Sequence, residues 1–234
     1  MKTTKVFFIL IFIAGFITAG FRLPGSDKEI ALAIKVIHDV AKKTAEVDWT
    51  TAKKGDFLYN NDMVRTGPRS IAIVKFKDNS MLRVRENAEL KLTGEQKDGK
   101  FNKTVHVEKG EFTFDIQKQE NEVFTFSSPT SVAAIRGTAG NMGSNENGDL
   151  MTVLHGLVNL FNSFSKQSVD VGAGQTGISN NDGTIYVRDS SQDEKNDAQN
   201  SLNATHNSGK EKELDIQLKD KEGNNKTLKI KYRD

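Results

Sequence analysis

The chain has 234 residues, enough for one domain with appendages, and a hydrophobic content of 36% with a mean hydropathy of −0.53 indicates a modest core. Lys and Arg number 33 against 31 Asp and Glu, so the net charge of +2 gives no strong field to attract nucleic acid or an anionic membrane. The absence of cysteine excludes disulfides, thiolate metal sites and a cysteine nucleophile.

Residues 1–20 have the layout of an export signal. Lys2 and Lys5 precede an apolar run over residues 6–17, and small residues follow at 18–20. The apolar segment 6–21 is shorter than the roughly 20 residues that cross a bilayer, which favours a cleaved signal peptide over an uncleaved membrane anchor. In either case we expect the rest of the chain to lie outside the cytoplasm, in the periplasm or on the outer cell surface.

Residues 30–188 alternate apolar and polar positions between turn residues, which predicts an all-β domain. A sandwich and a short solenoid-like stack of antiparallel hairpins fit this pattern equally well. Asp78-Asn79 separates two alternating runs and predicts a hairpin, and a second turn is expected at Lys109-Gly110. Residues 30–40 fit a helix or a strand, but their β-branched residues favour a strand.

A weak internal repeat relates residues 107–114 to residues 153–160. The two segments share apolar, glycine and alternating positions, and each predicts a strand, a glycine turn or bulge, and another strand. The repeat therefore suggests stacked hairpin layers.

The composition changes after residue 188. Residues 190–212 have no aromatic residue and many Ser, Asn, Asp, Glu and Lys, which predicts a disordered linker. Residues 213–234 alternate again around Gly223-Asn224, and we expect a small charged β-hairpin there.

No pattern indicates catalysis, a cofactor or a metal. The four histidines, His38, His106, His155 and His206, lack a ligand partner at metal-site spacing and are expected at the surface or at strand edges. The loop expected at 141–149 has oxygen ligands but no calcium-loop spacing, so a turn ending at Asn147-Gly148 explains it better. We therefore expect a protein that is not an enzyme.

The most informative segment is 127–138, a proline-led apolar run that ends in Arg136-Gly137-Thr138. Pro129 marks a strand boundary, residues 132–135 are expected to be a short buried run, and Gly137 marks a bend or a close approach. Arg136 has two interpretations. In the first, its guanidinium donates hydrogen bonds to carbonyl oxygens of a turn or to a carboxylate of the same fold. In the second, Arg136, Gly137 and Thr138 contact a partner.

These residues resemble the FecR-type periplasmic domain over roughly residues 34–187. The motifs that carry the resemblance are Trp49, Gly55-Asp56, Thr66-Gly67, the strand, turn and strand at 71–84, Gly110 with Phe112, Ser128-Pro129 through Arg136-Gly137-Thr138, the apolar-Gly strand at 153–158, and Gly174-Gln175.

The resemblance implies a sensory module of transmembrane regulators or of standalone envelope proteins. Two features of the family's regulators are not expected here. The regulators hold a sigma factor with a cytoplasmic segment, whereas only residues 1–5 of this chain could face the cytoplasm. The regulators also have a further C-terminal lobe, and the predicted linker and hairpin take its place. We expect a non-enzymatic module that binds an envelope protein or a cell-wall component and touches the membrane only through residues 6–21, if these are uncleaved. The alternative is a surface-exposed adhesion or glycan/peptidoglycan-binding protein.

Overall fold

The computed structural model describes residues 29–97, 100–120, 122–207, 212–219 and 225–232. The predicted signal peptide or anchor lies outside these residues. The strands are β1 (Ala31–Ile37), β2 (Val40–Lys43), β3 (Thr50–Thr51), β4 (Phe57–Leu58), β5 (Met63–Thr66), β6 (Ile71–Phe76), β7 (Met81–Val84), β8 (Glu89–Lys97), β9 (Lys100–Ile116), β10 (Glu122–Ser127), β11 (Ser131–Ile135), β12 (Thr138–Asn145), β13 (Gly148–His155), β14 (Leu157–Asn162), β15 (Ser168–Gly172), β16 (Gln175–Asn180), β17 (Ile185–Asp189), β18 (Lys212–Lys219) and β19 (Asn225–Tyr232).

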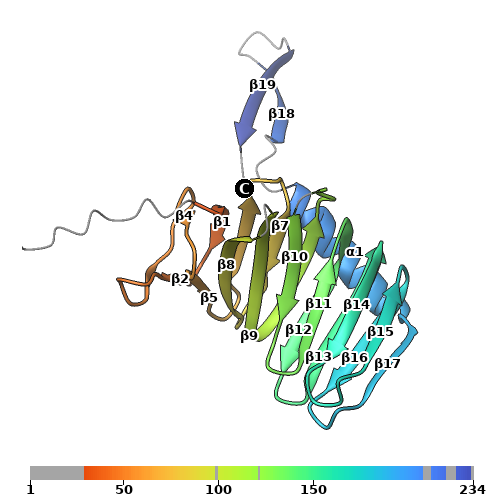
Figure 1. Ribbon diagram of the computed structural model, residues 1–234. Coiled ribbons are helices and arrows are strands. Elements are labelled where there is room, and N and C mark those ends of the chain that lie inside the picture. Colours follow the sequence, from red (N-terminus) through yellow and green to blue (C-terminus); the bar gives the residue numbers. More distant parts are fainter. Residues whose placement is uncertain (1–28, 98–99, 121, 208–211, 220–224, 233–234) are drawn as a thin grey trace, which may run out of the picture.

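Hydrogen bonds link β1 to β17 into one open sheet that folds into two layers (Figure 1). Sheet A has the order β4-β1-β6-β7-β9-β12-β13-β16-β17, and sheet B has the order β3-β2-β5-β8-β9-β10-β11-β14-β15. All pairs are antiparallel except β9 with β10. The chain alternates between the layers hairpin by hairpin, so the all-β prediction is confirmed, with a sandwich built from stacked hairpins.

Strand β9 belongs to both sheets. Residues 100–109 pair with β8 in sheet B, whereas residues 110–116 pair with β12 in sheet A. Gly110 makes the change of layer with a φ of +94°, and a Cβ there would lie 2.4 Å from Ala88. The prediction of a turn at Lys109-Gly110 is therefore wrong, because the strand bends at the glycine and continues.

Most other crossings between the sheets also have a residue with left-handed backbone. These residues are His38, Gly55, Asn61, Arg69, Asn87, Gly137, Gly156 and Gly174. The predicted repeat is explained by this pattern, because its two glycines, Gly110 and Gly156, each lie where the chain passes from one sheet to the other.

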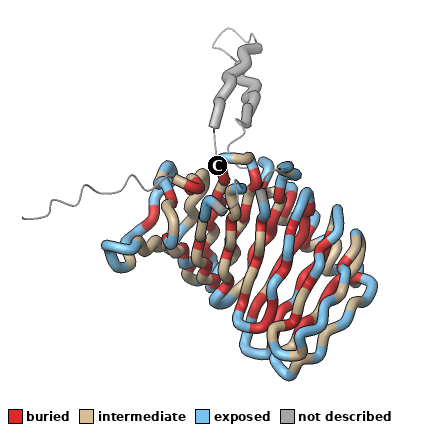
Figure 2. Tube along the Cα trace, viewed as in Figure 1, coloured by how far each residue is buried: buried red, intermediate tan, exposed pale blue. Residues whose placement is uncertain are grey.

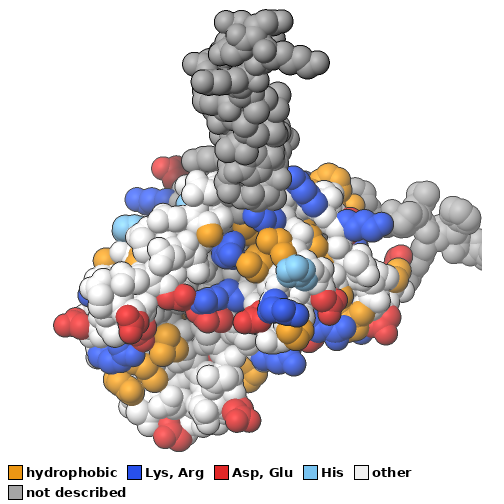
Figure 3. All heavy atoms as spheres, turned by 180° about the vertical axis from the view of Figure 1, so that it is seen from behind, with side chains coloured by type: hydrophobic (Ala, Val, Ile, Leu, Met, Phe, Trp, Pro, Cys, Tyr) orange, Lys and Arg blue, Asp and Glu red, His pale blue; other side chains and the backbone are white. Residues whose placement is uncertain are grey.

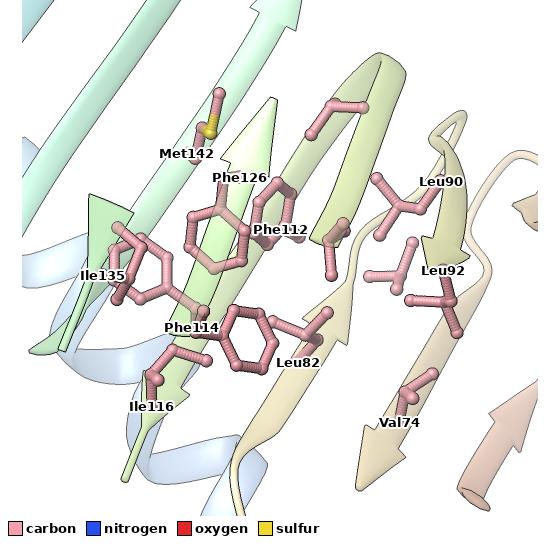
Figure 4. Close-up of a cluster of buried hydrophobic side chains, with 14 of the residues drawn as sticks. Val74, Leu82, Leu90, Leu92, Phe112, Phe114, Ile116, Phe126, Ile135 and Met142 are labelled. Atoms are coloured by element: carbon pink, nitrogen blue, oxygen red, sulfur yellow. The ribbon is translucent and has the colours of Figure 1, made fainter. Parts of the chain in front are cut away.

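The core lies between the two sheets and alternates with exposed positions along the strands (Figure 2). Phe112 and Phe114 of sheet A contact Phe126 of sheet B with ring centroids 4.9 Å apart in both pairs. The rings meet edge to face, which aromatic quadrupoles favour (Figure 4). Strand alternation thus places a phenylalanine cluster at the centre of the sandwich.

The predicted strand over residues 30–40 and the predicted hairpin at residues 72–84 are both confirmed, as β1 with β2 and as β6 with β7. Residues 132–135 are not a continuous buried run, because Ala133 and Ile135 face the core while Val132 and Ala134 face solvent. The expected loop at 141–149 is mostly strand, with a short turn between Asn145 and Gly148.

The prediction of a disordered linker over residues 190–212 is wrong for most of that segment. Residues Gln192–His206 form helix α1, which contacts β7, β9, β12 and β13 and so covers the outer face of sheet A. Ser191 and Glu194 form a capping box that supplies partners to the first free amides. Strands β18 and β19 form the predicted C-terminal hairpin as a separate two-stranded sheet.

Candidate functional site

Arg136 and Gly137 form the corner where the chain passes from β11 in sheet B to β12 in sheet A. Gly137 has a φ of +62°, a conformation that glycine adopts without strain. Thr138 is buried, and its hydroxyl donates to the carbonyl oxygens of Arg136 at 3.3 Å and Leu157 at 3.4 Å. A Cβ at Gly156 would lie 2.7 Å from Thr138 Oγ1. This corner and the β13–β14 corner therefore pack tightly against each other.

Arg136 is exposed and has no hydrogen bond or ion pair within the part of the chain that the structure describes. The structural bond expected for its guanidinium is thus not observed. Leu157, whose carbonyl bonds the same corner, has 58% of its surface exposed. The corner therefore offers a free planar donor beside an apolar side chain, a combination that can bind a carboxylate and an adjoining apolar group.

The start of the same motif is structural. The hydroxyl oxygen of Ser128 accepts hydrogen bonds from the amides of Thr130 at 3.0 Å and Ser131 at 2.9 Å, and the hydroxyl donates to the buried carboxylate of Asp149. These bonds close the β10–β11 hairpin at Pro129 and tie it to β13. The strand boundary predicted at Pro129 is therefore confirmed.

A second polar cluster lies between sheet A and α1. The Arg85 guanidinium donates to Glu111 at 2.8 Å and to both carboxylate oxygens of Asp197, at 2.6 and 3.1 Å. The side-chain amide of Asn141 donates to Asp197 at 3.0 Å. Burial raises the pKa of Glu111, and the nearby Asp197 adds to this effect, while Arg85 opposes it. We call Arg85, Glu111, Asn141 and Asp197 the helix latch.

Further polar contacts hold both ends of α1. Arg188 pairs with Glu194 through two hydrogen bonds of 2.8 and 2.7 Å, and His206 lies 3.0 Å from Asp115. Figure 3 views the molecule from behind, and charges of both signs lie across this side. Beside the latch a groove of about 400 Å³ is lined by Glu86, Glu111, Asn141, Glu194 and Asp197, among others. The helix is thus docked largely through polar groups.

The histidines do not converge. His38 and His155 are exposed, His106 bonds Ser127 at 2.9 Å, and His206 is at the end of α1 instead of in a linker. Among the described residues no group of three or more His, Cys, Asp or Glu side chains is arranged to hold a metal ion. Over the same residues, no helix has the length and apolar character to span a membrane.

Sequence reasoning missed the helix latch, because Arg85 follows β7 and the other three members come from β9, β12 and α1. The bonded pairs are separated by 26 to 112 positions. One signal was available for the helix itself. Ser191 followed by Glu194 has the spacing of a capping box, and Ala198 and Leu202 follow on one helical face.

Comparison with known proteins supports the resemblance. The model of the family described as "FecR protein" matches residues 62–159, which run from β5 to the middle of β14 and include both Gly110 and Arg136. A search of curated proteins found no match to this chain.

The chain is similar to two crystal structures of a protein from Parabacteroides distasonis ATCC 8503 that is provisionally described as an anti-sigma factor. They show 14% and 16% sequence identity with TM-scores of 0.46 and 0.47, and each match covers 54% of this chain. The chain spans 59% of the length of that protein in both comparisons. The segment that matches the FecR family model, residues 62–159, contains most of the motifs on which the resemblance was based.

Proposed function

We propose that the chain is an exported, non-enzymatic protein-recognition module of the bacterial cell envelope. The observation that carries the proposal is the Arg136 corner, which lies inside the segment matched by the FecR model and presents a guanidinium that bonds none of the described residues. An arginine that does not stabilise its own fold is free to bond an acidic group of another protein.

The corner is rigid, which favours recognition. The buried hydroxyl of Thr138 bonds the carbonyl oxygens of the two neighbouring corners, so the backbone beside Arg136 loses little freedom when a partner binds. Leu157 adds an apolar contact next to the charge. We propose a partner segment with a carboxylate flanked by an apolar residue.

Strand addition is the second contact mode that we propose. Strands β15 and β17 are the last strands of sheets B and A, and within the described residues each pairs on one side only. Such edges offer free backbone donors and acceptors to an extended segment.

Site-specific cross-linking in cells tests this proposal. A photo-reactive residue at Leu157 is expected to capture one envelope protein, and Arg136→Glu is expected to reduce that product at least tenfold. The same residue at Phe57, which is 50% exposed in β4, serves as the matched control and is expected to give no such product. Identical products from both positions, or a product unaffected by Arg136→Glu, would overturn the proposal.

The proposed location is tested separately. The mature N-terminus and the cell fraction of the native protein distinguish a released protein from an anchored one. Protease treatment of intact cells separates a periplasmic module, which we propose, from a surface-exposed adhesion protein.

A further inference from the structure

A small cavity lies where the β5–β6 corner and β7 approach the middle of α1. It has a volume of about 220 Å³ and is lined by Arg69, Ser70, Arg83, Arg85, Glu86 and Ser201, among others. The proposed protein-recognition corner at Arg136 does not contribute to it. Three arginines thus line one cavity.

Two arginines differ in their pairing, Arg83 within β7 and Arg85 directly after its last residue. Arg85 is neutralised by Glu111 and Asp197, whereas Arg83, two residues away on the same face of the strand, has no hydrogen bond or ion pair to any described residue. Arg83 is nevertheless partly buried. Burial, followed by repulsion from Arg85, lowers the pKa of Arg83. An anion in the cavity would relieve both effects.

The other groups that face the cavity define what can bind. Within the described residues the side chain of Arg69 also has no hydrogen bond or ion pair, while its backbone amide donates to the Glu86 carboxylate at 2.6 Å. Ser201 adds a hydroxyl from α1, and Glu86 is the one carboxylate among the described residues that line the cavity. Glu86 is exposed and Arg83 is partly buried, so solvent screens the repulsion between Glu86 and an anion more than it screens the attraction of Arg83.

We propose that this cavity binds a small oxyanion, phosphate or a carboxylate, between Arg83 and Arg69. The planar guanidinium fork of arginine matches two oxygens of such a group. The volume is below the roughly 300–1,000 Å³ of pockets that enclose drug-sized ligands, so the ligand is a small ion or the terminal group of a larger molecule.

Calorimetric titration of the whole protein with inorganic phosphate, and in a second series with acetate, at constant ionic strength tests the proposal. We expect saturable binding of at least one of these ions. Arg83→Gln is expected to weaken binding at least tenfold without loss of folding, since the Arg83 side chain bonds none of the residues that the structure describes. Glu86→Gln is expected to tighten binding several-fold, because it removes the opposing charge and keeps an acceptor for the Arg69 amide.

Arg136→Gln is the matched control. Arg136 likewise bonds no residue in the described part of the chain, but it is exposed, and this variant is expected to bind the ions like the wild type. Preference for phosphate identifies a tetrahedral oxyanion, and preference for acetate identifies a carboxylate. Absence of binding of both ions, unchanged binding in Arg83→Gln, or an equal loss in Arg136→Gln would overturn the proposal. None of these results depends on the proposed partner of the Arg136 corner.

Discussion

The two faces of sheet A are held by different interactions. Its inner face packs against sheet B through buried apolar side chains, with Phe112, Phe114 and Phe126 in edge-to-face contact. Its outer face meets α1 through arginine, carboxylate and amide groups, with Ala198 and Leu202 as the buried apolar contribution. Apolar burial stabilises roughly in proportion to area, while partly exposed ion pairs contribute little. The sandwich should therefore be much more stable than the docking of the helix.

The largest effect is expected from Phe126→Ala. Phe126 is fully buried and contacts three other phenylalanines, so its truncation removes transfer free energy and leaves a cavity. We expect a loss of about 3–5 kcal/mol in the free energy of unfolding, measured by urea denaturation. Phe57→Ala, at a half-exposed position, serves as the control and should cost far less. Similar losses in both variants would contradict a core centred on Phe126.

A smaller effect is expected from Ser191→Ala at the start of α1. The hydroxyl oxygen of Ser191 accepts a hydrogen bond from the amide of Glu194, and loss of such a cap typically costs about 1 kcal/mol. Helix content followed by circular dichroism during urea denaturation measures it. Ser191→Asp keeps an acceptor and should retain the stability of the helix, whereas an equal loss in both variants would argue against the cap.

Asp197→Ala tests the helix latch. The change removes the partner that Arg85 holds with two hydrogen bonds, but the Asp197 side chain is 45% exposed and solvent screens the pair. We expect a loss of at most about 1 kcal/mol, seen as earlier melting of α1. Asn200→Ala on the exposed face of the helix is the control. Matching stabilities for the two variants would show that the latch does not hold the helix.

The last prediction concerns acid. The hydrogen bond from Arg188 is the main reason that the pKa of Glu194 is lowered from 4.5 to about 2. A carboxylate whose pKa is lowered on folding stabilises the fold above its unfolded pKa, and this contribution is lost as the pH falls from about 4.5 towards 2. In that range the wild type should lose helix stability more steeply than Glu194→Gln. Parallel curves would contradict this role of Arg188.

The same contrast separates what the sequence reveals from what it does not. Alternation along 71–76 and 112–116 follows from strand geometry, so the hairpin and the phenylalanine core are predictable. Helix α1 is polar over most of its surface, and its composition resembles that of a disordered segment. Only the spacing of Ser191 and Glu194 signals it. The latch depends on side chains that the fold alone brings together.

The motif that ends in Arg136 was predictable in part. Pro129 and Gly137 mark backbone positions, and local sequence identifies such positions well. Whether the Arg136 guanidinium finds an internal partner depends on which groups surround the corner in space. No pattern along the chain contains that information.

Native-state hydrogen exchange tests the central comparison most directly, since it measures the opening free energy of each element in one molecule. We predict that the amides of α1 exchange through a local opening well below the free energy of global unfolding, while those of β9, β10 and β12 exchange only on global unfolding. Asp197→Ala should speed exchange in α1 and leave the strands unchanged. Exchange of α1 at the same free energy as the strands would contradict the account, because the helix would then be part of the cooperative core.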